Sequence, residues 1–110
     1  MQVTNVSRLP GSERSRLFEG SAYGATVTLF SIDYPEPGLG PGLHRHPYDE
    51  TWLILEGRAL LHVDGEEQEA GPGDIAVAPA HAPHKFTSLT PLRVVCVHAS
   101  PVRIQEDLEP

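Results

Sequence analysis

Glycine and proline interrupt this chain too often for long helices. Its 110 residues include 10 glycines and 11 prolines. No stretch of ten residues keeps the 3.6-residue apolar periodicity of an amphipathic helix. Between the breaks lie short segments rich in β-branched and aromatic residues, such as residues 25–34 (ATVTLFSIDY) and 50–56 (ETWLILE). Such segments are typical of β-strands. The sequence therefore predicts an all-β fold, a sandwich or barrel of eight or nine short strands.

Turn signals set the expected strand boundaries. Asp64-Gly65 favours a two-residue type I′ hairpin turn, because both central positions of that turn need positive φ. Residues 71–73 (GPG) and 79–83 are further breaks. We expect residues 12–19 to be irregular and residues 102–110 to form a docked or fraying tail. The expected strands are residues 3–6, 25–34, 43–46, 50–56, 59–63, 66–70, 74–78, 84–89 and 92–98.

Length and charge narrow the class of protein. The length suits one domain with one modest core, expected over residues 1–110. The net charge of −7 repels phosphate backbones, so no nucleic-acid partner is expected. No apolar run approaches the roughly 20 residues of a membrane helix, and residues 1–16 lack an apolar signal segment. Cys96, the single cysteine, fits a reducing compartment, and a cytoplasmic protein without a membrane partner is expected.

Four residues form a candidate metal site: His44, His46, Glu50 and His84. Alternate side chains of an extended segment share a face, so both imidazoles of the His-X-His pair can point at one place. The glutamate heads the next strand, and the third histidine opens another strand after a proline-rich turn. This set suits one divalent transition metal (Fe, Mn, Zn, Ni or Co) and leaves coordination positions open. From the spacing alone, solvated histidines remain an alternative.

The residues around these four resemble the cupin superfamily. The first cupin motif is a glycine, five residues, His-X-His, three or four residues, a glutamate, six residues and a glycine. Residues 38–57 match it at Gly38, His44, His46, Glu50 and Gly57. The second motif corresponds to residues 73–88 and matches at Gly73, Pro79 and His84. It departs from the pattern at His81, where glycine is usual, and at Ser88, where asparagine is usual.

The resemblance implies a small single-domain metal-binding cupin. Its fold would be a double-stranded β-helix, a jelly-roll-like barrel, with the metal inside the mouth. It also implies a homodimer, for which the amino-terminal strand and the last strand are the expected edges.

Strand parity adds candidate pocket walls. Inward residues of a closed barrel alternate along each strand. Counting from Glu50, the inward face includes Trp52 and Ile54; counting from His84, it includes Phe86 and Ser88. These four are expected to line a pocket that is apolar with a few polar groups. For the tryptophan, packing in the core is an equally good interpretation.

The last strand supplies one further candidate. His98 shares its parity with Val94 and Cys96, and it is either an acid/base group or a hydrogen-bonded core histidine. Cys96 is expected to be an inert buried thiol. Eight apolar residues are expected to supply a core that needs no metal: Leu53, Leu55, Leu61, Val63, Ile75, Val77, Val95 and Val97.

Two functions fit these features. One is a metal-dependent enzyme of dioxygenase, isomerase or lyase type that acts on a small organic molecule. The other is a cupin that binds or senses a small ligand without turnover. Fold and ligand set alone do not choose between them, nor do they name the substrate, the reaction or the native metal.

Overall fold

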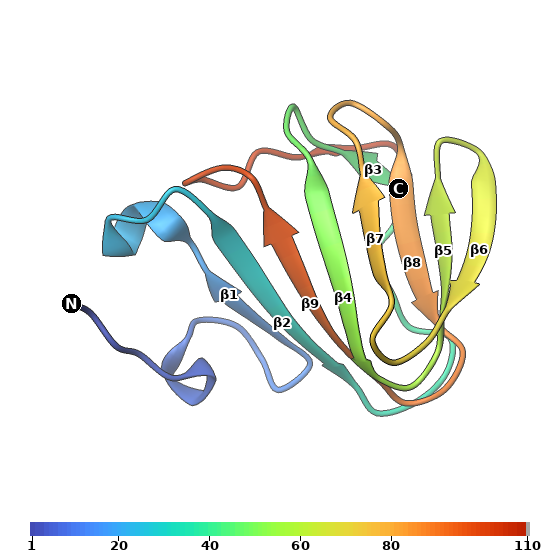
Figure 1. Ribbon diagram of the computed structural model, residues 1–110, viewed down its shortest axis with the longest axis horizontal. Coiled ribbons are helices and arrows are strands. Elements are labelled where there is room, and N and C mark those ends of the chain that lie inside the picture. Colours follow the sequence, from blue (N-terminus) through green and yellow to red (C-terminus); the bar gives the residue numbers. More distant parts are fainter. Residues whose placement is uncertain (110) are drawn as a thin grey trace.

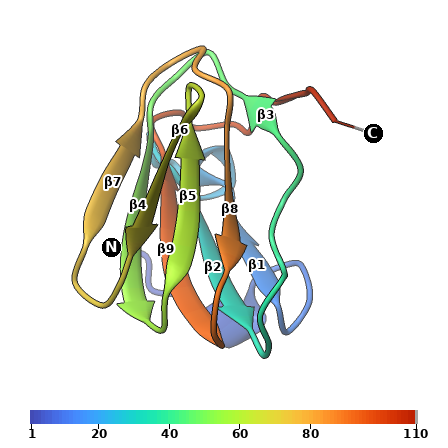
Figure 2. The same ribbon diagram turned by 90° about the vertical axis from the view of Figure 1, so that its right-hand side faces the viewer.

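Two five-stranded antiparallel sheets face each other in the computed structural model, which describes residues 1–109 (Figures 1 and 2). The first sheet has the order β1 (Ser15–Phe18), β2 (Thr28–Tyr34), β9 (Leu92–His98), β4 (Glu50–Glu56), β7 (Ile75–Ala78). The second has the order β10 (Glu106–Asp107), β3 (His44–Arg45), β8 (His84–Ser88), β5 (Ala59–Val63), β6 (Glu66–Ala70). The chain crosses repeatedly between the sheets, and the expected double-stranded β-helix is confirmed.

Helical structure is limited to two 3-10 turns among the described residues, η1 (Val6–Arg8) and η2 (Gly20–Tyr23). Within residues 1–109, neither the length nor the apolar character of any helix suffices to cross a membrane.

Most strand boundaries follow the turn signals. The strands β4, β5, β6 and β9 have the expected bounds. The Asp64-Gly65 turn joins β5 to β6 with φ values of 50° and 83°, as a type I′ turn requires. Four other expected strands are shorter by one to three residues at an end, and two segments were assigned wrongly. Residues 3–6 form no strand. Residues 15–18, expected to be irregular, form β1, because each of them pairs with a residue of β2 at the sheet edge.

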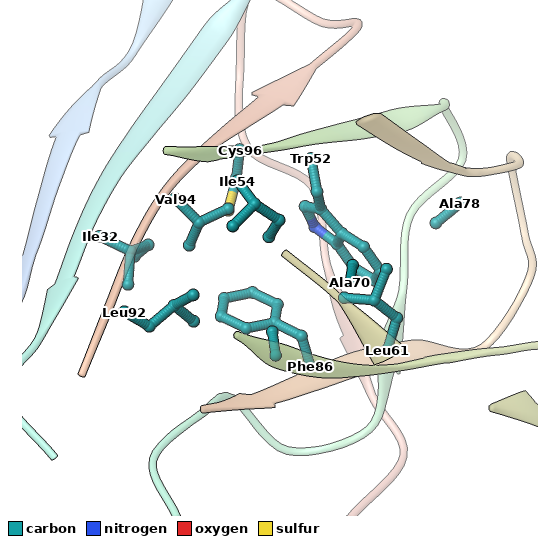
Figure 3. Packing of buried hydrophobic residues seen from close by; sticks show 11 residues of the cluster. Ile32, Trp52, Ile54, Leu61, Ala70, Ala78, Phe86, Leu92, Val94 and Cys96 are labelled. Atoms are coloured by element: carbon teal, nitrogen blue, oxygen red, sulfur yellow. The ribbon is translucent and has the colours of Figure 1, made fainter. Parts of the chain in front are cut away.

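The core fills the space between the sheets (Figure 3). Its side chains come from alternate positions of the strands, and burial of each large apolar side chain contributes roughly 1.5–3 kcal/mol. The buried cluster comprises Ile32, Trp52, Ile54, Ala59, Leu61, Ala70, Ala78, Phe86, Leu92, Val94 and Cys96.

The expected list of core residues was wrong in its parity. Since Trp52 and Ile54 point inward, their neighbours on β4 point outward. Leu55, Ile75 and Val77 are 42%, 67% and 55% exposed. Leu53, Val95 and Val97 are half-buried on the same outer face. Of the eight residues, Leu61 lies in the buried cluster and Val63 packs against it.

The sheet order also corrects the expected dimer edges. The strand β9 lies between β2 and β4, so it has no free edge to offer a second copy. The edge strands are β1 and β7 in one sheet and β10 and β6 in the other. The homodimer itself stays a prediction.

Candidate metal centre

Strand pairing gathers the candidate ligands at one end of the barrel, the upper end in Figure 1. In the second sheet His44 on β3 pairs with His84, the first residue of β8. In the first sheet Glu50, the first residue of β4, pairs with His98, the last residue of β9. His46 follows β3 by one residue. The two sheets therefore bring their strand ends together over a common point.

The four expected ligands form one buried group. The ligand atoms of His44, His46, Glu50 and His84 lie within 4.8 Å of one another. Each of these residues is at most 4% exposed. The carboxylate oxygen Oε1 of Glu50 lies 3.0 Å from Nε2 of His46 and 3.1 Å from Nε2 of His84. The described residues thus contain a group that could hold a metal ion.

Backbone carbonyls orient the three histidine rings. Nδ1 of His44 lies 2.6 Å from the carbonyl oxygen of Gly42, and Nδ1 of His84 lies 2.8 Å from that of Ala82. Nδ1 of His46 lies 2.6 Å from the carbonyl oxygen of Ile104. Since a carbonyl only accepts, each Nδ1 carries a proton, and Nε2 is the ring atom that faces the group. For His46 and His84 this atom can bind a metal ion or, with a second proton, donate to Glu50. Such partners are typical of metal-bound histidines.

This arrangement fits a cation at its centre. Three ring nitrogens and a carboxylate oxygen converge here, and their lone pairs repel one another unless a proton or a metal ion lies between them. Burial raises the pKa of Glu50, but hydrogen bonds from His46 and His84 outweigh it, so the pKa lies well below its usual value. Burial lowers the pKa of His44, which favours its neutral, metal-binding form.

Trp52 belongs to this centre through its indole nitrogen. Its Nε1–H donates a hydrogen bond to Oε2 of Glu50, which leaves Oε1 to face the histidines. The side chain is 1% exposed and packs in the core. Sequence parity placed it on the inner face but gave no sign of this hydrogen bond.

A cavity of about 170 Å³ lies beside the four residues. His44 and Glu50 reach its wall, and Phe30, Ile32 and Phe86 form much of its apolar lining. Of the four expected pocket walls, Phe86 lies on this cavity. Trp52 and Ile54 lie on β4 and pack in the core without lining the cavity, because the cavity lies mainly against β2 and β9. Ser88 lies at the opposite end of β8, where its hydroxyl donates to the carbonyl of Glu36 and accepts from the backbone N–H of Leu39.

His98 lies on the cavity wall and is held by Tyr48. The tyrosine hydroxyl accepts a hydrogen bond from the backbone N–H of Ile104 at 3.2 Å and lies 2.7 Å from Nδ1 of His98. The hydroxyl proton still needs an acceptor, and Nδ1 is the one in reach among the described residues, so the hydroxyl donates to Nδ1 and the histidine proton resides on Nε2, 3.3 Å from Glu50 Oε1. Burial lowers the pKa of His98 to about 4, despite the nearby carboxylate. Tyr48 and its role were not expected from the sequence.

Two turn positions of the cupin motifs have a left-handed backbone conformation. Gly57 has φ of 82°, and a Cβ there would lie 1.9 Å from the carbonyl oxygen of Pro91, so no side chain fits. His81, at the usual glycine position of the second motif, also has a positive φ of 69°. Its backbone N–H donates to the carbonyl of His46 at 2.7 Å. The turn therefore keeps a left-handed residue even without glycine.

Residues 101–109 cross the mouth of the barrel beside β3 (Figure 2). The segment is held by the hydrogen bonds of its residue 104 to His46 and Tyr48 and by the ion pair of Arg45 with Glu106. It contributes Arg103 and Gln105 to the cavity wall. The sequence predicted a docked or fraying tail over residues 102–110; residues 102–109 are docked, and residue 110 lies outside the described residues. Its part in the cavity had no signal in the sequence.

Comparisons with known proteins identify the family. Residues 32–98 match the family described as Cupin domain. An uncharacterized protein of Methanocaldococcus jannaschii is 37% identical over 70 residues, 61% of this chain and 55% of that protein. L-ectoine synthase of Mycolicibacterium gilvum is 35% identical over 65 residues, 57% of this chain and 49% of the enzyme. The dimethylsulfoniopropionate lyase DddQ of Ruegeria pomeroyi is 31% identical over 67 residues, 60% of this chain and 33% of the enzyme. The chain thus spans about half of the length of the first two relatives.

Solved structures agree on the fold. A conserved protein with a double-stranded β-helix domain from Klebsiella pneumoniae aligns with a TM-score of 0.75 at 21% identity and covers 100% of this chain and 99% of that chain. Oxalate decarboxylase from Bacillus subtilis aligns with a TM-score of 0.81 at 17% identity over 98% of this chain and 33% of that chain. At these identities the likeness shows the fold alone. Together with the family match, it shows that the chain belongs to the cupin family.

Proposed function

We propose that this cupin domain holds one divalent transition metal through His44, His46, Glu50 and His84 and acts with it on a small organic molecule. The observation that carries the proposal is the buried donor group with a cavity at its side. Similarity to an L-ectoine synthase and to a dimethylsulfoniopropionate lyase supports an enzyme. Among the dioxygenase, isomerase and lyase types, the second relative's name favours the lyase type.

The chain's own residues would prepare this site in three ways. The carbonyl partners of the three histidines keep their Nε2 atoms free for the ion. The apolar side chains of Phe30, Ile32 and Phe86 keep water away from one side of the substrate. Nε2–H of His98 faces the cavity region beside Glu50, where it can donate a hydrogen bond to a substrate oxygen. A bound divalent ion supplies Lewis-acid polarisation of such an oxygen.

Elemental analysis of three proteins tests the metal assignment. Wild type should contain up to one metal ion per chain. His46→Ala should lose most of the metal, because this change removes one metal-binding nitrogen. It also leaves the backbone carbonyl of Ile104 without the imidazole that it orients. His62→Ala is the control, since that histidine pairs with Glu67 on the β5–β6 hairpin and lies outside the group. Full occupancy in His46→Ala would refute the ligand set.

Turnover decides between the two functions. Wild type loaded with Fe(II), Mn(II) or Zn(II) should convert some member of a panel of small organic acids, diketones, catechols and sugar derivatives. His98→Asn, with its metal content checked, should be slower on the same member. If panel members bind to the loaded protein and are recovered unchanged, the ligand-sensing function replaces the enzymatic one.

A further inference from the structure

The cavity beside the metal group has one arginine on its wall. Arg103, from the segment that crosses the barrel mouth, is the single Lys or Arg side chain among the residues that line it. Its guanidinium carbon lies 5.7 Å from the centre of the Phe30 ring, which lines the same cavity. One of its N–H groups donates to the side-chain oxygen of Gln105 at 2.9 Å. The guanidinium is thus placed at the cavity by a ring face and by a neutral partner.

This arginine differs from most basic residues of the chain. The protein has 15 acidic and 8 basic residues. Five of the eight pair with a carboxylate: Arg14, Arg45, Arg58, Lys85 and Arg93. Within residues 1–109, Arg103 has no such pair, although Glu19 accepts a hydrogen bond from its backbone N–H. A guanidinium has five N–H donors in a planar fork, and here most of them are free for a ligand.

The charges around the cavity favour an anionic ligand only when the metal is present. Without an ion, the carboxylate of Glu50 on the cavity wall opposes an anionic ligand. A divalent ion on the four ligands reverses this sign. The cavity then has positive charge at the metal group and at Arg103. The apolar side chains of Phe30, Ile32 and Phe86 form other parts of its wall. Its volume of about 170 Å³ suits a molecule of roughly six heavy atoms, at about 30 Å³ for a water-sized unit.

We infer that the ligand of this cavity is a small carboxylic acid whose carboxylate binds Arg103 while its other end faces the metal group. The inference rests on the proposed function, because the metal must offset the charge of Glu50. The arginine acts as a specificity-determining residue: it selects an acid over the neutral analogue of the same shape. The fork of N–H donors matches the two oxygens of a carboxylate.

Binding of matched acid–amide pairs tests this inference without any need for turnover. Zn(II)-loaded protein, with one metal per chain by elemental analysis, is titrated calorimetrically with lactate and lactamide and with glycolate and glycolamide. We expect at least one acid to bind wild type about fivefold or more tightly than its amide, since a charge-assisted pair at a partly exposed site is modest in strength. Arg103→Gln should remove this preference, and Arg103→Lys should restore part of it.

Controls separate this inference from the proposed function. Arg93→Gln removes the same charge at a residue that pairs with Glu56, outside the cavity lining, and should bind the acids like wild type. If wild type takes up no metal, the proposed function fails first. If wild type and Arg103→Gln hold equal metal and bind each acid equally, or if no acid binds better than its amide, the inference is overturned and the metal assignment stands.

Discussion

The indole of Trp52 provides the sharpest test of the metal centre, because it contacts the ligand carboxylate and has no expected contact with the ion. Trp52→Phe keeps an aromatic ring at a position that is 1% exposed but removes the N–H that donates to Oε2 of Glu50. A hydrogen bond to a charged group contributes about 1.5–3 kcal/mol. Because 1.4 kcal/mol is a factor of ten, the dissociation constant for Zn(II) should rise about 10- to 100-fold, the usual effect of such outer partners.

The same substitution also removes packing volume, so a control must separate the two effects. Ile54→Ala deletes a buried side chain two residues further along β4 without touching a polar group. It should lower the free energy of unfolding by about 2–5 kcal/mol and leave the Zn(II) dissociation constant within about threefold of wild type. Competition with a chelator measures the affinity, and urea denaturation measures the stability. Unchanged affinity in Trp52→Phe, or equal weakening in both variants, would refute the reasoning.

Three further predictions follow from the same geometry. The pKa of His98 lies at about 4 against 6.5 in an unfolded chain, so the unfolded state takes up the proton first as the pH falls. Between pH 7 and pH 4, metal-free wild type should therefore lose about 3 kcal/mol more free energy of unfolding than metal-free His98→Asn. Urea denaturation measures both, and an equal loss in the two proteins would contradict the prediction. His81→Gly should raise the free energy of unfolding by up to about 1 kcal/mol, because the exposed histidine has φ of 69°, and a clear loss would show that its side chain is needed. Size-exclusion chromatography with light scattering should show a homodimer, and a monomer at micromolar concentration would end that expectation.

Local patterns were enough to predict most of the fold. Alternation and turn residues act over a few positions, so they determine strands such as residues 50–56 and the hairpin at Asp64-Gly65. The first strand was missed for the opposite reason. Residues 15–18 have little strand pattern of their own, and their extended form depends on pairing with β2. The exposed apolar face of β7 was taken for core because apolar character alone does not say which face of a sheet is covered.

The candidate site was predictable only in part. The spacing of the cupin motifs identified four residues that the structure brings together. Parity placed Trp52 and Ile54 on the correct, inward face, but it does not say which strands a cavity lies against, and this cavity lies mainly against β2 and β9. The segment at residues 101–109 has no apolar pattern. Its place over the barrel mouth depends on hydrogen bonds of its residue 104 to His46 and Tyr48, which lie far away in the sequence. No local signal reports such contacts.

The ring nitrogens show why residue type alone could not separate the candidate metal ligands around Glu50 from the other histidine beside it. Nε2 of His98 lies 3.3 Å from Oε1 of Glu50, close to the 3.0 Å of His46 and the 3.1 Å of His84. The difference lies on the far side of each ring. A carbonyl there accepts the proton of Nδ1 and leaves Nε2 free to bind a cation, whereas the hydroxyl of Tyr48 donates to Nδ1 of His98 and keeps the proton on Nε2. The partner of Nδ1 therefore makes two of these rings metal donors and the third a hydrogen-bond donor to whatever occupies the cavity.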